Sequence, residues 1–211
     1  MILLILIIGL VLYIFNETKI WFAPNEVEVK QTSTSKTYVD PEETLRLGTI
    51  TKLNGNNIQY LRLNAIKQKR GYQKNTRNIV FFEGDDMKSH WLFETNNNKI
   101  EIIDHLQKSE DELEQRETIA LYYQLRNEDT DNNGKIDKND TLKIALTSPN
   151  GHDYTEITKG MTSVLDHSID EDALVLTLLT QVEDTLIMTK YSLQTKMKIS
   201  EREITRIGKK F

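Results

Sequence analysis

The sequence predicts a mainly β fold built from antiparallel meanders, and three observations support this. Segments in which apolar and polar residues alternate recur roughly every ten to twelve residues beyond residue 41. Clusters of Asn, Asp, Gly and Pro separate these segments, as expected for tight turns. No G-x-G-x-x-G motif, P-loop or regular exchange of strand and helix patterns occurs, which argues against a nucleotide-binding α/β fold.

The composition is that of a folded domain, and it excludes several kinds of site. The chain has 211 residues, of which 38% are hydrophobic and 28% charged, and its formal net charge is −5. Because phosphate binding needs a basic field, this balance argues against nucleic acid as a partner. The chain contains no cysteine, so disulfides, thiolate metal sites and cysteine nucleophiles are excluded.

Residues 1–23 predict an N-terminal transmembrane or signal-anchor helix. Residues 1–15 carry no charged side chain, and the apolar stretch at 20–22 brings the segment close to the roughly 30 Å of a bilayer core. A cleaved signal peptide is the alternative. It is less favoured because no basic residue precedes the apolar run, no A-x-A site follows it, and Pro24 comes directly after Ala23.

We expect residues 24–40 to form a flexible tether and residues 41–211 to form one β-rich domain. The tether is rich in Ser and Thr and shows no hydrophobic period. Beyond it, turn clusters at 54–57 and 84–86 predict hairpins, with Trp91 in the core. The strands expected in this part cover residues 44–52, 58–65, 78–83, 89–95 and 99–104.

The second half of the domain continues the strand pattern. Residues 109–117 fit either a short helix that begins with a capping box or a solvated loop. The segment 118–126 then carries apolar residues at a period of two, which places on one face Ile119, Leu121, Tyr123 and Leu125. Further strands are expected at residues 141–147, 154–158, 161–169, 172–181, 185–193 and 197–207, with 172–181 as a central strand.

The most informative segment is the loop 129–140, with the sequence DTDNNGKIDKND. Oxygen-bearing side chains occupy positions 1, 3, 5, 9 and 12 of this twelve-residue loop, with Gly134 at position 6 and Ile136 at position 8. Ca²⁺ takes about six to eight oxygen ligands, and this spacing turns alternate side chains inward while the glycine permits a sharp bend. The alternative is a polar hairpin loop whose Asp and Asn side chains only cap turns.

We expect this loop to bind one Ca²⁺ ion, because carboxylates packed this closely would repel one another without a cation. Lys135 would contribute its backbone carbonyl, and Asp137 a direct or water-mediated contact. The full set of predicted ligands is Asp129, Asp131, Asn133, Lys135, Asp137 and Asp140. Strand patterns on both sides of the loop leave no pair of helices to open, so we expect a structural ion and not a sensor switch.

The loop resembles EF-hand and dockerin-type calcium loops over its twelve residues. It departs from them at the last position, where Asp140 replaces the usual Glu, and a shorter side chain reaches the ion less easily. The rest of the chain, with NIVFF at 78–82 before HWLF at 90–93, resembles bacterial envelope proteins that carry such a loop. That resemblance implies no particular activity.

Residues 143–158 (KIALTSPNGHDYTEIT) resemble the blade repeat of TolB-like β-propellers, in which a Ser-Pro-Asp-Gly turn joins two strands. Asn150 replaces the Asp of that turn. The resemblance implies a few propeller-like blades. Because about 170 residues fall short of four blades of about 40 residues each, the sheets would form either a small open stack or an unrelated meander.

The sequence offers no catalytic constellation. The four histidines show no paired metal spacing and no G-x-S-x-G elbow is present, so we expect the following to be surface or turn residues: His90, His105, His152 and His167.

These observations predict a calcium-binding module anchored by a single span in the bacterial inner membrane. Its domain would face the periplasm or the exterior, where calcium is abundant enough for weak sites. We expect a non-enzymatic binding or scaffolding role with a protein or polysaccharide partner. The alternative is an envelope hydrolase with a structural calcium, which a pocket holding two histidines beside carboxylates would favour.

Overall fold

The computed structural model describes residues 43–67, 73–108, 116–161 and 163–206. Within these ranges all regular structure is β and all strand pairs are antiparallel, which confirms the mainly β prediction. The predicted anchor at 1–23, the tether at 24–40 and most of the 109–117 segment lie outside the described residues. In the described part of the chain, no helix has the length and apolarity needed to cross a membrane.

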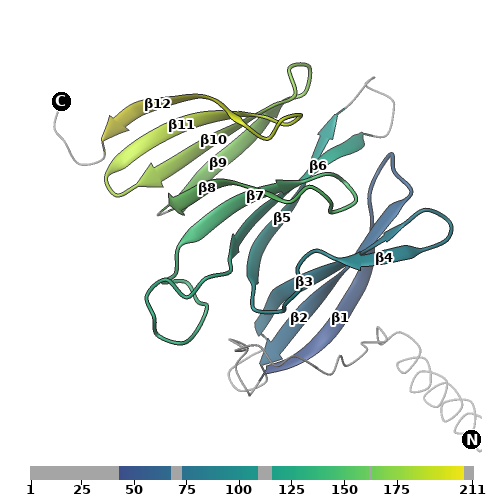
Figure 1. The fold of residues 1–211 in the computed structure, drawn as a ribbon. Coiled ribbons are helices and arrows are strands. Elements are labelled where there is room, and N and C mark those ends of the chain that lie inside the picture. The colour runs from purple at the N-terminus through teal and green to yellow at the C-terminus, as the bar shows by residue number, and fades with distance from the viewer. Residues whose placement is uncertain (1–42, 68–72, 109–115, 162, 207–211) are drawn as a thin grey trace, which may run out of the picture.

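The twelve strands form three consecutive meanders of four strands each (Figure 1). The first contains β1 (Glu43–Lys52), β2 (Ile58–Lys67), β3 (Gln73–Glu83) and β4 (Lys88–Trp91). The second contains β5 (Lys99–Lys108), β6 (Glu117–Arg126), β7 (Leu142–Thr147) and β8 (Thr155–Met161). The third contains β9 (Ser163–Asp170), β10 (Val175–Val182), β11 (Thr185–Ser192) and β12 (Lys198–Arg206).

The first two meanders belong to one eight-stranded sheet, and the third is a separate four-stranded sheet. The link within the larger sheet is narrow, since β3 and β5 pair only at Thr76 and Ile100. In the third sheet the order is β12-β11-β10-β9, so β10 lies in its interior. The expectation of a central strand near 172–181 is therefore confirmed.

Two hydrophobic cores lie on opposite faces of the middle meander. The first core joins it to β2 and β3, and its largest buried side chains are Tyr60, Ile79, Phe81, Leu121, Tyr123 and Leu125. The second core joins it to β10 and β11 through Tyr122, Ile144, Leu146, Leu176, Leu178 and Tyr191. Burial on both faces explains the unbroken apolar run at residues 119–123 of β6 and the burial of every residue of β7.

The predicted face of β6 is correct for three of its four residues. Leu121, Tyr123 and Leu125 lie in the first core, but Ile119 packs against the second core. The register between β5 and β6 shifts between the Leu106–Ala120 and Gln107–Thr118 pairs. This β-bulge adds one residue to β6 and so reverses the side on which Ile119 lies.

Strand β4 ends earlier than predicted, and Trp91 is 42% exposed rather than in the core. The side chain of Asn78 explains the early end. Its amide nitrogen donates to the backbone carbonyls of Phe93 and Thr95, and its oxygen accepts from the Phe93 backbone nitrogen at 3.1 Å. These bonds replace the ladder that a longer β4 would make with β3.

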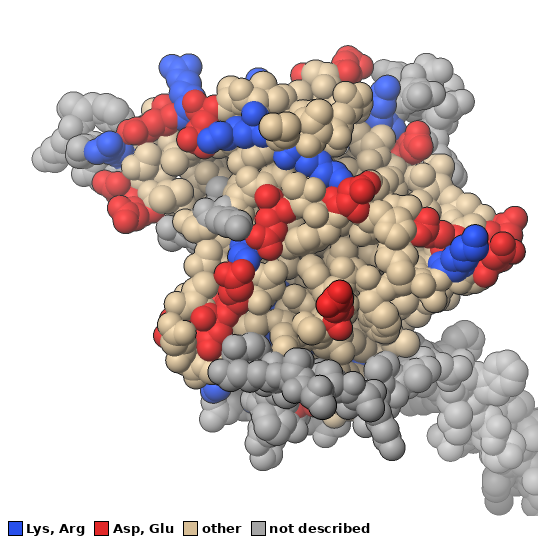
Figure 2. Space-filling view, viewed as in Figure 1, with Lys and Arg blue, Asp and Glu red and all other residues tan. Residues whose placement is uncertain are grey.

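The charged surface is mixed in sign. Figure 2 shows acidic and basic side chains interspersed over the visible face. Acidic side chains gather at the lower left of this view, where Figure 1 places the connection between β6 and β7. That connection contains the predicted calcium loop.

Candidate metal centres

The loop 129–140 joins β6 to β7, so two strands flank it as the sequence predicts. One carboxylate oxygen from each of Asp129, Asp131 and Asp140 lies within 4.8 Å of the other two. Since Ca–O bonds measure about 2.3–2.6 Å, two oxygens on one ion are at most roughly 5 Å apart. The three carboxylates are therefore close enough to share a single Ca²⁺.

Backbone nitrogens of the loop orient the first two of these carboxylates. Asp129 accepts hydrogen bonds from the backbone nitrogens of Asn133, at 3.0 Å, and Gly134, at 2.9 Å. Asp131 accepts from the backbone and the side chain of Asn133. The sharp bend occurs at Gly134, whose φ of 81° lies in the left-handed region that favours glycine.

Asp140 closes the loop from its far end. One of its oxygens accepts from the Thr130 backbone at 2.6 Å and from the Thr130 hydroxyl at 3.2 Å, and the other accepts from the Asp137 backbone at 2.7 Å. Its side chain is buried, and its backbone carbonyl accepts from Arg126 at 2.8 Å. A shorter acid than Glu suits this position, because the carboxylate also holds the loop's own backbone.

The hydrogen bonds to Asp140 also affect its ionisation. Burial raises the pKa of this carboxyl, but the backbone nitrogens of Asp137, Thr130 and Asp131 together outweigh burial and lower the pKa below its ordinary value. Asp140 is therefore a carboxylate at neutral pH, as a cation ligand must be.

The remaining predicted ligands are less closely grouped. Asn133 uses its side-chain oxygen to accept from the Lys135 backbone, and Asp137 accepts from the Asn139 backbone. Asp137 does not belong to the close group of three carboxylates. Ile136 is buried, as an aliphatic residue at position 8 should be, whereas Lys135 is exposed.

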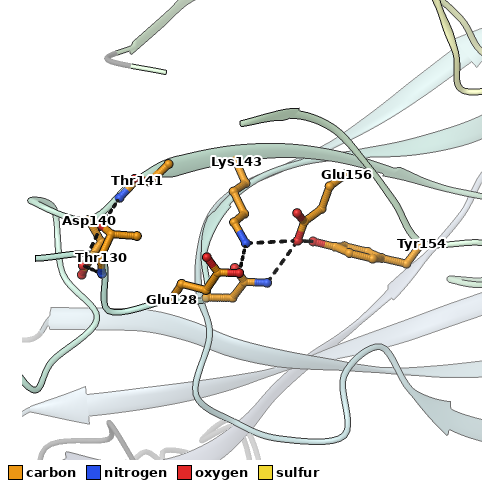
Figure 3. A network of polar contacts seen from close by, with 8 residues as sticks. Glu128, Thr130, Asp140, Thr141, Lys143, Tyr154 and Glu156 are labelled. Atoms are coloured by element: carbon orange, nitrogen blue, oxygen red, sulfur yellow. Dashed lines mark hydrogen bonds and ion pairs between the residues drawn. The ribbon is translucent and has the colours of Figure 1, made fainter. Parts of the chain in front are cut away.

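An ion-pair network holds the base of the loop (Figure 3). The ammonium of Lys143 on β7 is nearly fully buried and lies 2.6 Å from Glu128 and 3.4 Å from Glu156. Tyr154 also donates to Glu156, and burial is the main cause that raises the pKa of the Tyr154 phenol. The sequence shows no signal for this network, because its members come from the β6–β7 connection, β7, the β7–β8 connection and β8.

A second group of metal-ligating side chains lies at the other end of β7. Glu83 from the end of β3, His90 from β4 and His152 from the β7–β8 turn place one ligand atom each within 4.8 Å of the others. One Glu83 oxygen lies 3.1 Å from His152 Nε2 and 3.5 Å from His90 Nδ1. The other accepts from the Asn150 amide at 2.8 Å.

Packing holds this second group in place. The His90 ring lies between two rings, stacked on Phe81 with centroids 5.5 Å apart and on His152 at 4.1 Å. Desolvation and the neighbouring His152 lower the pKa of His90, so its imidazole is neutral at neutral pH. His152 is an exposed turn residue, as expected, whereas His90 lies on β4 with its ring stacked between two others.

Part of this group could have been found from the sequence. In the β3–β4 hairpin, Phe81 pairs with His90 and Glu83 pairs with Lys88. Alternate residues share a face, so Glu83 and His90 are diagonal neighbours on one side of the hairpin. His152 has no such local signal, because it is 69 residues away from Glu83 in the chain.

The other two histidines form separate contacts. His105 lies 3.0 Å from the Tyr60 hydroxyl and, with Asp104, lines a cavity of about 390 Å³. His167 Nε2 lies 2.9 Å from Asp104, and its ring stacks on Tyr122. His90 and His152, which meet beside Glu83, thus lie on a partly exposed surface. The histidine that lines this cavity is His105.

Comparisons with known proteins give the chain no family. No protein-family model matches it, and no curated protein matches it significantly. Among solved structures, the β-propeller domain of the Trilobed protease from Pyrococcus furiosus is similar with a TM-score of 0.41 and 10% identity, covering 77% of this chain and 44% of that one. A luciferin-regenerating enzyme is similar with a TM-score of 0.36 and 10% identity, covering 86% and 65%.

The chain therefore spans less than half of the first structure and about two thirds of the second. The first is a β-propeller domain, the fold to which the predicted blade repeats belong. Because both TM-scores are below 0.5, the likeness is too weak to assign a closed topology, an activity or a ligand.

Proposed function

We propose that this protein is a calcium-binding module in which one structural Ca²⁺ ion sits in the loop 129–140. The observation that carries this proposal is the close grouping of the carboxylates of Asp129, Asp131 and Asp140, each already oriented by backbone nitrogens of the same loop. The ion would neutralise their mutual repulsion and tie β6 to β7, which pack in both cores.

The wider role proposed for this module is non-enzymatic binding or scaffolding outside the cytoplasm. An apolar N-terminal helix at residues 1–23 would anchor it, and propeller-like meanders would carry the surface for a protein or polysaccharide partner. In support, apolar side chains of the third sheet are exposed to solvent: Leu165, Met188, Ile199 and Ile204. Apolar side chains exposed on one sheet offer contact area to such a partner.

The test is calorimetric titration of Ca²⁺ into the full 211-residue chain, kept in detergent and stripped with EDTA. We expect one ion per chain, and a loss of affinity of at least about 10-fold in Asp131→Ala. This variant should fold, because Asp131 is exposed and its carboxylate accepts hydrogen bonds from the backbone and side chain of the neighbouring Asn133.

Asp172→Ala is the matched control. It removes the same charge from an exposed turn between β9 and β10, so it should leave calcium affinity unchanged. Absence of a binding isotherm in the unmodified chain, together with an identical melting temperature in millimolar calcium and in EDTA, would refute the proposal.

A further inference from the structure

The group formed by Glu83, His90 and His152 has the composition of a transition-metal site and not of a calcium site. Two imidazole nitrogens and one carboxylate oxygen are ligands that Zn²⁺ and related first-row ions accept, whereas Ca²⁺ prefers oxygen alone. The three residues come from β3, β4 and the β7–β8 turn, so the group exists only in the folded domain.

The distances from the Glu83 oxygen to the two imidazole nitrogens fit one tetrahedral ion. With Zn–N and Zn–O bonds of about 2.0–2.1 Å, neighbouring ligands of a tetrahedral zinc lie about 3.3 Å apart. The Glu83 oxygen is 3.1 Å from His152 Nε2 and 3.5 Å from His90 Nδ1. Three protein ligands leave the fourth position of such an ion to water.

Neighbouring residues fix two of the three ligands. Asn150 donates to the Glu83 oxygen that the histidines do not approach, which leaves the other oxygen directed between the two rings. Phe81 stacks on His90 and is fully buried in the first core. Hydrogen bonds to a ligating carboxylate and packing against a ligating ring are what orient the ligands of known metal sites.

The third ligand has to turn when an ion binds. The rings of His90 and His152 are almost parallel, 9° apart, and a metal lies in the plane of each imidazole that binds it. One ring must therefore leave the stack. His152 can do so because its side chain is 55% exposed, whereas His90 is confined between two rings.

We propose that Glu83, His90 and His152 form a Zn²⁺-binding site on the domain surface, separate from the calcium loop. The site joins the β3–β4 hairpin to the turn after β7. It therefore adds a link between the first and second meanders, whose strands β3 and β5 pair only at Thr76 and Ile100. The six-residue β7 separates the two centres, at about 3.3 Å per residue. Each ion should therefore bind independently of the other.

The test is titration of Zn²⁺ into the full, tag-free chain in detergent, with millimolar Ca²⁺ present to occupy the loop. We expect one zinc per chain. Glu83→Gln and His152→Ala should each weaken binding by at least about 10-fold to 100-fold, since loss of an outer partner alone has that effect. Co²⁺ in place of Zn²⁺ should give the intense visible absorption of a four-coordinate complex.

His167→Ala is the matched control. Like His90, His167 stacks on an aromatic ring and pairs with a carboxylate, but it lies on β9 and outside the proposed site. Its loss should leave zinc affinity and the cobalt spectrum unchanged, and Asp131→Ala should do the same. Absence of zinc binding in the unmodified chain, or equal binding in His152→Ala, would overturn the proposal. Circular dichroism of each variant checks that any loss of zinc binding is not caused by unfolding.

Discussion

The two candidate metal centres lie at opposite ends of β7 and are assembled in opposite ways. All ligands of the loop come from twelve consecutive residues, whose own backbone nitrogens orient Asp129, Asp131 and Asp140. The histidine site takes its ligands from three segments. It depends on ring stacking and on one hydrogen bond that the Asn150 side-chain amide donates to Glu83. The loop is thus locally organised, whereas the histidine site is organised by the packing of two meanders.

This difference has consequences for stability. Removal of the Asp140 carboxylate leaves partly buried backbone donors without acceptors, which is costly. Removal of an exposed ligand from the histidine site, such as His152, leaves the cores intact. The stability of the loop should therefore depend on its acidic side chains. The geometry of the histidine site should depend on the core beneath it.

The largest effect is expected from Gly151→Ala in comparison with Gly134→Ala. Both glycines have nearly the same φ, 82° and 81°, but a Cβ at Gly151 would lie 2.3 Å from the buried Phe81 ring, whereas at Gly134 it would meet open space. We expect Gly151→Ala to lower the free energy of unfolding by about 2–5 kcal/mol, as strain and overpacking add.

Gly134→Ala should lower the same free energy by only about 1–2 kcal/mol, the strain of a left-handed alanine. Urea denaturation of both variants in EDTA measures the difference. Gly151 precedes His152 in the β7–β8 turn. Equal losses of unfolding free energy in the two variants would contradict the idea that the turn of the histidine site packs on the core more closely than the calcium loop does.

The second expected effect concerns Asp140. Its carboxylate is buried and accepts from the backbone of Thr130, Asp131 and Asp137, so Asp140→Ala leaves several donors unsatisfied. We expect a loss of about 2–4 kcal/mol in the calcium-free protein. His152→Ala should lose less than about 0.5 kcal/mol, as is usual for surface positions.

Urea denaturation in EDTA would compare these two variants as well. A small loss for Asp140→Ala would mean that the loop is held together by its ion and not by its own hydrogen bonds.

A third effect is a crossed pattern of stabilisation by the two metals. At 100 times its dissociation constant, each ion should raise the free energy of unfolding by about 2.7 kcal/mol. At the same ion concentration, calcium stabilisation should fall by at least about 1.3 kcal/mol in Asp131→Ala and be unchanged in His152→Ala, and zinc stabilisation should show the reverse. Thermal melts of the two variants, each with calcium, zinc or EDTA, give this pattern. A variant that abolished both effects would show that the centres are coupled.

The smallest expected effect is an acid dependence that belongs to the loop. Because the folded state lowers the pKa of Asp140, its stabilising contribution is complete above the ordinary pKa of 3.8 and is lost as pH falls through the folded value. The stability difference between the unmodified chain and Asp140→Asn should therefore shrink as pH falls below about 4. Urea denaturation between pH 2 and pH 6 in EDTA tests this, and a constant difference would contradict it.

Much of the fold could be predicted because its signals are local. Turn clusters such as 54–57 and 84–86 separate the strands, and the alternation in β6 and β7 is visible in the sequence. Errors arose where a contact distant in the chain changed a local pattern. The bulge at Ile119 depends on the register with β5, and the early end of β4 depends on the side chain of Asn78.

By itself the sequence determined the mainly β fold and the calcium-loop pattern, because both depend on the spacing of neighbouring residues. Only the tertiary structure decided that the middle meander is buried on both faces, that Lys143 joins Glu128 to Glu156, and that His152 meets Glu83. The ion pairs join different strands and connections, with partners 13 to 69 residues apart in the chain. Their partners are chosen by how sheets pack, and no local spacing encodes that choice.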